Sequence, residues 1–110
     1  MSSVDVGSVT DLPERGARCV RIGATTVAVF RTSGGGIFAL RDQCPHRGGP
    51  LSQGIVHGTR VTCPLHDWVI DLKTGKATGV DEGSTPTFTV RVIDGRVVLE
   101  LPAELLARAS

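Results

Sequence analysis

The chain has 110 residues, of which 40% are hydrophobic, and it carries 12 Lys and Arg against 11 Asp and Glu. This near-balance of charge argues against binding to nucleic acid or to an anionic membrane surface. No stretch approaches the roughly 18 consecutive apolar residues of a membrane span, and Met1 to Asp11 lacks the basic start and apolar stretch of a secretion signal. We therefore expect one domain, spanning 1–110, that works in the cytoplasm with proteins or small molecules as partners.

Short segments rich in Val, Ile, Thr and Phe recur along the chain, separated by glycine turns, and this pattern predicts an all-β fold. The predicted strands are 18–22, 26–30, 37–41, 60–63, 68–72, 87–93 and 96–101. Turns are predicted at 34–36, 73–75 and 94–95, the last as a tight Asp-Gly hairpin with positive φ. Only 102–108 has a helical pattern, because Pro102 suits the first turn of a helix.

Two loops each combine a cysteine with a histidine. Residues 44–49 read Cys-Pro-His-Arg-Gly-Gly, and residues 63–68 read Cys-Pro-Leu-His-Asp-Trp. Each loop therefore offers one thiolate and one imidazole. A [2Fe–2S] cluster needs two protein ligands per iron, and two such loops can place both cysteines on one iron and both histidines on the other. The four candidate ligands are Cys44, His46, Cys63 and His66.

The alternative is a zinc site, since two cysteines and two histidines also satisfy a tetrahedral Zn²⁺ ion. Such a chain would be a zinc-stabilised interaction module. Zinc motifs usually pair cysteine with cysteine and histidine with histidine, whereas each loop here mixes the two. Pro45 and Pro64 restrict the backbone beside the ligands, and Gly48, Gly49 and Gly54 permit a close approach to the cluster. We therefore favour the iron–sulfur cluster.

At these residues the chain resembles the Rieske family, through CPHRGGPLSQG at 44–54 and CPLHDWVIDLKTGKA at 63–77. The resemblance implies a β-sandwich base, about 1–40 and 78–110, with a cluster-binding subdomain at about 41–77 inserted between its strands.

The resemblance also implies the roles of the ligands. Cys44 and Cys63 would bind a buried iron, while His46 and His66 would bind an outer iron and present exposed imidazole edges as the exit for electrons. No catalytic residue is predicted, because the chain carries no substrate-pocket motif of its own.

A cluster held by two thiolates and two neutral imidazoles carries less negative charge than one held by four thiolates, so it is easier to reduce. Members of the family in cytochrome bc complexes raise the potential further with an extra disulfide between the loops and with Ser and Tyr hydrogen-bond donors. Here the corresponding positions hold Gly49, Leu65, Trp68 and Ile70. We therefore expect a potential at the low end of the Rieske range, suited to electrons from NAD(P)H through flavin.

Within the family the chain is most similar to the small subunits of assimilatory NAD(P)H nitrite reductases, through 44–77 and FTVRVIDGRVVLEL at 88–101. That similarity implies a large partner subunit that carries FAD, sirohaem and a [4Fe–4S] cluster and reduces nitrite to ammonium. The alternative is a free Rieske ferredoxin that supplies electrons to a ring-hydroxylating oxygenase. Such shuttles often carry marked negative charge, so the near-neutral charge of this chain favours a bound subunit.

Four further residues have simpler expected roles. His57 is expected to be a solvated loop residue, and Cys19 a buried structural thiol. Trp68 is expected to pack under the second loop rather than to form a docking surface, because tryptophan is usually largely buried. Arg47 is expected to be exposed beside His46.

Overall fold

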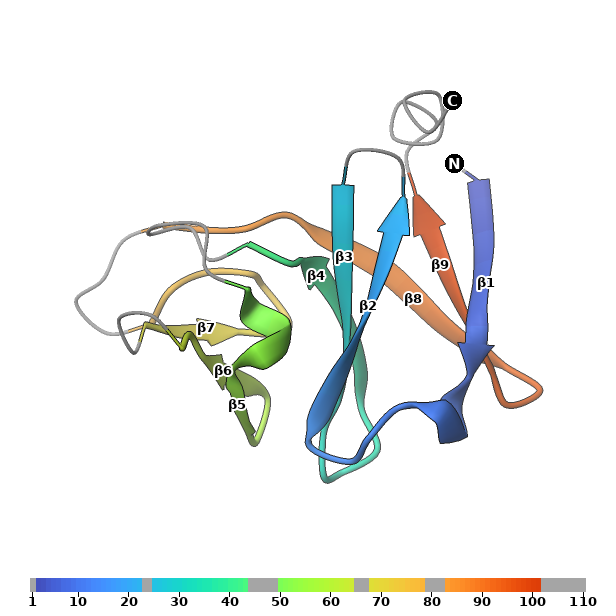
Figure 1. Cartoon of the computed structure of the whole chain (residues 1–110), viewed down its shortest axis with the longest axis horizontal. Helices are drawn as coiled ribbons and strands as arrows, with labels where there is room; N and C mark the ends of the chain where they lie inside the picture. Colours follow the sequence, from blue (N-terminus) through green and yellow to red (C-terminus); the bar gives the residue numbers. More distant parts are fainter. Residues whose placement is uncertain (1, 23–24, 44–49, 65–67, 79–82, 102–110) are drawn as a thin grey trace.

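The computed structural model describes residues 2–22, 25–43, 50–64, 68–78 and 83–101. These residues form nine β-strands and two short 3-10 helices, and no α-helix occurs among them (Figure 1). The all-β fold expected from the sequence is confirmed. Within the described ranges, no helix has the length and apolar character needed to cross a membrane.

The elements follow one another along the chain in an order that returns the last strand beside the first. They are β1 (Ser2–Ser8), η1 (Val9–Asp11), β2 (Gly16–Ile22), β3 (Thr25–Arg31), β4 (Ile37–Arg41), η2 (Leu51–Gln53), β5 (Ile55–His57), β6 (Arg60–Thr62), β7 (Val69–Asp71), β8 (Thr87–Ile93) and β9 (Arg96–Leu101).

Six strands form one antiparallel sheet in the order β1-β9-β8-β4-β3-β2. Strands β4 and β8 pair over only two positions, Ala39 with Phe88 and Leu40 with Thr87. The sheet folds over at this short junction, so that the β2-β3-β4 half and the β8-β9-β1 half enclose an apolar core between them (Figure 1). The buried residues of this sandwich core are Leu12, Ile22, Val27, Val29, Ala39, Val97, Leu99 and Leu101.

Strand β3 is buried on both faces, because every residue from Val27 to Phe30 is fully inaccessible to solvent. Side chains alternate across a strand, so Val27 and Val29 point into the sandwich core while Ala28 and Phe30 point into a second core on the other side. The buried residues of this second core are Ala28, Phe30, Leu40, Leu51, Val56, Val61, Cys63, Ile70 and Leu72. One β-layer therefore serves as the wall of two cores.

A small antiparallel sheet of order β5-β6-β7 covers that second face. It contributes Val56, Val61 and Ile70, the middle residues of its three strands, to the second core. In Figure 1 it lies to one side of the sandwich, together with η2.

Strand β1 is an addition to the strands expected from the sequence. It pairs with β9 from Ser2 to Ser8, and Val4 and Val6 pack against the sandwich core. The Arg96 guanidinium donates two hydrogen bonds to the Asp5 carboxylate, at 3.1 and 2.9 Å. This fork lowers the pKa of Asp5, with help from the Gly7 N–H, and ties the first strand to the last one described. Its hydrogen-bonding partner lies some 90 residues away, so the local pattern did not reveal it.

Strand β5 was also not expected, because three residues are too few to show an alternating pattern. The last hairpin agrees with the prediction: Asp94 and Gly95 adopt φ values of 50° and 77° between β8 and β9. The helix expected at 102–108 lies outside the described residues.

Gly75 provides a test of how the turn after β7 is held. It has a φ of +74°, and a Cβ atom there would collide with the carbonyl oxygen of Thr85. Gly95 has a similar φ of +77° but nothing within 4 Å of its Cβ position. We expect Gly95→Ala to lower the free energy of unfolding by about 1 kcal/mol through backbone strain alone, and Gly75→Ala to lower it by about 2 to 4 kcal/mol because the clash adds to the strain. Urea unfolding of the two variants measures the difference, and equal losses would contradict it.

Candidate functional site

Of the four candidate ligands, Cys63 lies among the described residues, whereas Cys44, His46 and His66 lie outside them. Cys63 follows β6, is only 1% exposed, and is part of the second core. Its thiol is in no disulfide. Within the described ranges, no three His, Cys, Asp or Glu side chains gather in a way that could hold a metal ion. The geometry of the site must therefore be built from the residues that flank the two loops.

The second loop is closed at its neck by the backbone. The Cys63 N–H donates a hydrogen bond to the Trp68 carbonyl oxygen, at 2.7 Å, directly after the β6–β7 pair of Thr62 with Val69. Residues 63–68 therefore form a short loop that leaves and re-enters the same antiparallel ladder. The Trp68 side chain is half-buried and packs against the second core, which confirms the expected packing.

The first loop is closed at its neck by side chains. Asp42, just after β4, and Ser52, in η2, flank residues 44–49. The Ser52 N–H donates to Asp42 Oδ1 at 2.7 Å, and the Ser52 hydroxyl donates to Asp42 Oδ2 at 2.8 Å. The sequence analysis did not identify this pair. An aspartate beside a turn is a frequent acceptor for backbone N–H groups, but a partner ten residues away is not readable from that preference.

The two necks lie next to each other. Ile55 pairs with Thr62, the residue before Cys63, so the segment that leaves the first loop enters the ladder from which the second loop departs. The contact is tight at Gly54, where a Cβ atom would collide with the carbonyl oxygen of Thr62. Leu51, fully buried, packs in the same core as Cys63. The fold therefore brings both Cys-His loops to one end of the small sheet.

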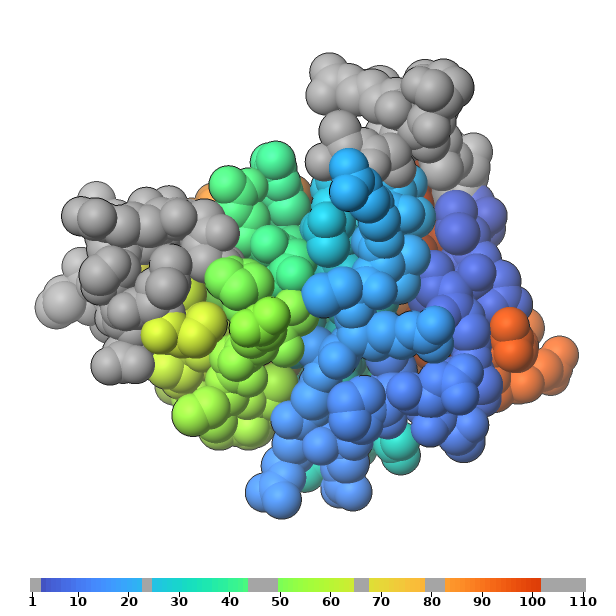
Figure 2. All heavy atoms as spheres, viewed as in Figure 1, coloured from blue at the N-terminus to red at the C-terminus, as the bar shows by residue number. Residues whose placement is uncertain are grey.

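Cys19 departs from the expectation of a buried thiol, because it is exposed. Strand β2 is the edge of its sheet, and the face that carries Cys19 is covered only in part, by η2. The Cys19 Sγ atom lies 3.0 Å from Ser52 Oγ and 3.2 Å from Asp42 Oδ2. Partial burial raises the pKa of the thiol, the Ser52 hydrogen bond lowers it, and the Asp42 carboxylate raises it further, so the net shift is upward. Figure 2 shows the segment after the first loop lying directly against β2.

His57 and Ile70 flank the site without contributing to it. His57 is exposed, as expected, although it ends β5 rather than lying in a turn, and its Nε2 atom lies 2.7 Å from Thr62 Oγ1. Ile70 is fully buried in the second core, so the position where high-potential members carry a tyrosine donor holds an apolar side chain here. Arg47, Gly49 and Leu65 lie outside the described residues.

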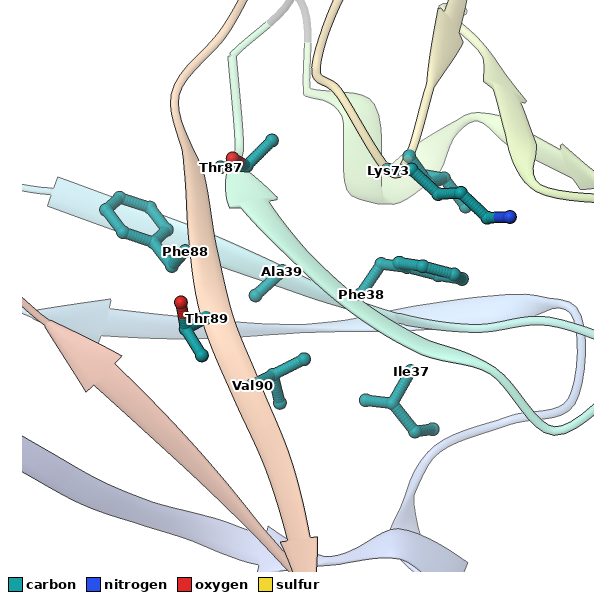
Figure 3. A pocket seen from close by; sticks show the side chains of 9 residues that line it. Ile37, Phe38, Ala39, Lys73, Thr87, Phe88, Thr89 and Val90 are labelled. Atoms are coloured by element: carbon teal, nitrogen blue, oxygen red, sulfur yellow. The ribbon is translucent and has the colours of Figure 1, made fainter.

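A groove of about 350 Å³ opens where β4 and β8 diverge beyond their short junction (Figure 3). Its lining residues are Ile37, Phe38, Ala39, Leu72, Lys73, Thr87, Phe88, Thr89 and Val90. Only Lys73 among them is ionisable, so these side chains provide neither an acid–base pair nor a nucleophile with its base. None of them is a candidate cluster ligand.

The elevated thiol pKa of Cys19 gives a direct prediction. Asp42→Asn removes the nearby negative charge, so the pKa should fall and the thiolate fraction at neutral pH should rise. We expect alkylation of Cys19 by iodoacetamide, followed by peptide mass spectrometry, to become about threefold faster or more, with its pH midpoint moved down. Asp71→Asn is the control, because Asp71 accepts the Lys73 N–H at 2.8 Å in a separate turn. An unchanged midpoint in Asp42→Asn would contradict the assigned cause.

Comparisons with known proteins agree with this geometry. The chain is 34% identical to the ferredoxin subunit of anthranilate 1,2-dioxygenase from Burkholderia cepacia, over 84% of this chain and 85% of that subunit. Other relatives that match over nearly the whole chain are also ferredoxin components of dioxygenase systems. The crystal structure of a candidate NADPH nitrite reductase small subunit superposes with a TM-score of 0.81, at 27% identity, over 92% of this chain and 100% of that one.

A match can also be confined to part of a larger enzyme. The 4beta-methylsterol monooxygenase of Methylococcus capsulatus is 42% identical over 60 residues, which make up 54% of this chain but only 16% of that protein. The family model described as the Rieske [2Fe–2S] domain matches residues 2–97. Because this match takes in both loops and both cores, the chain belongs to the Rieske [2Fe–2S] family of electron-transfer proteins.

Proposed function

We propose that this Rieske protein is the small electron-transfer subunit of an assimilatory NAD(P)H nitrite reductase, which reduces nitrite to ammonium. The observation that carries the proposal is the run of residues 44–77, in which both loops and the turn after β7 resemble such subunits. The end-to-end likeness to the candidate NADPH nitrite reductase small subunit supports it. So does the near-zero net charge, which suits a bound subunit better than a diffusing shuttle.

The residues proposed to hold the single [2Fe–2S] cluster are Cys44, His46, Cys63 and His66. The described part of the site fits this role, because Cys63 offers an unpaired thiol, 1% exposed, at the neck of a closed loop. Two thiolates and two imidazoles are the donor set of a Rieske centre, and the bound cluster supplies one-electron transfer.

The surroundings of Cys63 indicate how the chain would divide the work between the ligands. Apolar side chains of the second core exclude water from the Cys63 side, and the Trp68 carbonyl holds its backbone N–H. We propose that the cysteines anchor the cluster to this core while the histidines face outward, toward the electron-transfer partner. The buried Ile70 offers no hydrogen bond to the cluster, which supports a low potential.

The proposed partner is a large subunit that carries FAD, sirohaem and a [4Fe–4S] cluster, and the assembly would work in the cytoplasm. Electrons would enter from NAD(P)H at the flavin. This chain would relay them and carry no substrate itself.

A second candidate is a Rieske ferredoxin that supplies a ring-hydroxylating oxygenase. The specific observation in its favour is the 34% identity to the anthranilate 1,2-dioxygenase ferredoxin subunit over most of both chains. Both candidates share the fold, the proposed ligands and one-electron chemistry, so the partner protein distinguishes them.

The ligand set predicts the composition of the purified protein. We expect a red-brown chain with two irons and two sulfides, and an electron paramagnetic resonance spectrum in the reduced state with the low average g value of mixed nitrogen and sulfur ligation. Cys63→Ser should abolish the cluster and lower the melting temperature, since a bound cofactor stabilises only the folded state. Cys19→Ser is the matched control and should retain both irons. Stoichiometric zinc, or a full cluster in Cys63→Ser, would overturn the assignment.

The proposed partner is tested by co-purification and reconstitution. The chain is co-expressed with the flavin–sirohaem subunit from the same genome, and NAD(P)H-dependent nitrite reduction is measured with the wild-type chain and with Cys63→Ser. We expect a stable complex, with activity that falls at least tenfold when Cys63→Ser replaces the wild type, if the cluster relays electrons. No complex, together with rapid reduction of a ring-hydroxylating oxygenase by the reduced chain, would favour the second candidate and overturn the first.

A further inference from the structure

Three side chains from separate segments meet at the neck of the first ligand loop. Asp42 follows β4, Ser52 lies in η2, and Cys19 lies on β2. Asp42 accepts two hydrogen bonds from Ser52, at 2.7 and 2.8 Å, one from the backbone and one from the hydroxyl. The Cys19 thiol closes the group, at 3.2 Å from the carboxylate and 3.0 Å from the hydroxyl. We call these three residues the neck cluster.

The neck cluster joins two anchored points. The Asp42 N–H donates to the Thr26 carbonyl oxygen at 2.8 Å, which fixes Asp42 to strand β3. On the other side, Ser52 follows Leu51, whose fully buried side chain is held in the second core. The ends of the intervening segment, residues 43–51, are therefore held together and held against the sheet.

The two ligand loops differ in how they are closed. The second is closed by a backbone hydrogen bond from Cys63 to Trp68, which is available to almost any sequence. The first depends on a carboxylate and a hydroxyl, so its closure is encoded by side chains. Hydrogen bonds to a charged carboxylate are stronger than those between neutral groups, which makes Asp42 the member with the largest expected effect.

We propose that Asp42 is a positioning residue for the cluster, and that the neck cluster of Asp42, Ser52 and Cys19 determines how firmly the first loop retains its ligands. This inference rests on the proposed ligand set, in which Cys44 and His46 belong to that loop. Holding the ends together removes open conformations of the loop, so its two ligands stay in place relative to those of the second loop. Without Asp42 the loop opens more often, and each opening exposes the iron to competing ligands.

The experiment uses the full cluster-bearing chain and compares Asp42→Ala with Asp71→Ala. Asp71 is a matched control, because it is also half-buried and accepts a backbone N–H, from Lys73 at 2.8 Å, but in the turn after β7. The measurements are the rate at which an iron chelator bleaches the visible absorbance, the reduction potential, the g values of the reduced cluster, and urea unfolding of the cluster-free chains.

We expect Asp42→Ala to lose its cluster about tenfold faster than Asp71→Ala, with altered g values and potential, even where the two cluster-free chains are equally stable. Ser52→Ala, which keeps the backbone hydrogen bond, should show a smaller increase, and Asp42→Asn should restore part of the loss because it keeps an acceptor. These two milder variants also carry the test if Asp42→Ala does not fold.

The outcomes separate the two proposals. If the wild-type chain holds a [2Fe–2S] cluster but the Asp42 and Ser52 variants release it no faster than Asp71→Ala, with unchanged g values, the neck cluster has no positioning role. A wild-type chain that holds no iron and sulfide would overturn the ligand set first, and this inference with it.

Discussion

The structure depends on one β-layer that is buried on both faces. Because side chains alternate along β3, Val29 faces the sandwich core and Phe30 faces the second core, and both are fully inaccessible to solvent. Neither core can form without this layer, so the sandwich and the small sheet that bears the loops share one source of stability. A strand buried on both faces also moves little, which gives the ligand loops a rigid support.

Connectivity then brings the two loops together. The first loop leaves β4, and its far end enters the ladder of the small sheet through the pair of Ile55 with Thr62. The second loop leaves the same ladder at Cys63. Each neck is closed by hydrogen bonds that satisfy polar groups beside an apolar core, where unpaired groups would be costly. The proposed cluster would therefore sit where closed loop necks and a buried core meet.

Membership of the Rieske family assigns the chemistry of the chain, one-electron transfer, while the partner is a property of the surface. The same fold is similar to a dioxygenase ferredoxin subunit and to a candidate nitrite reductase small subunit. Core packing does not distinguish them, because the residues that hold the fold are buried and meet no partner. Charge and shape around the loops, together with retention of the cluster, are the features on which the two proposed roles would differ.

Much of this molecule was determined by local sequence. The apolar alternation of 37–41, 87–93 and 96–101 predicted strands with the bounds that the structure has, and the Cys-His loops were evident from spacing, because such patterns depend only on neighbouring residues. The tertiary structure alone decided β1, the exposure of Cys19 and the bond between Asp42 and Ser52. Each of these depends on a partner distant in the chain: β1 needs β9, and Cys19 is exposed because its strand is the edge of a sheet whose order no local pattern encodes.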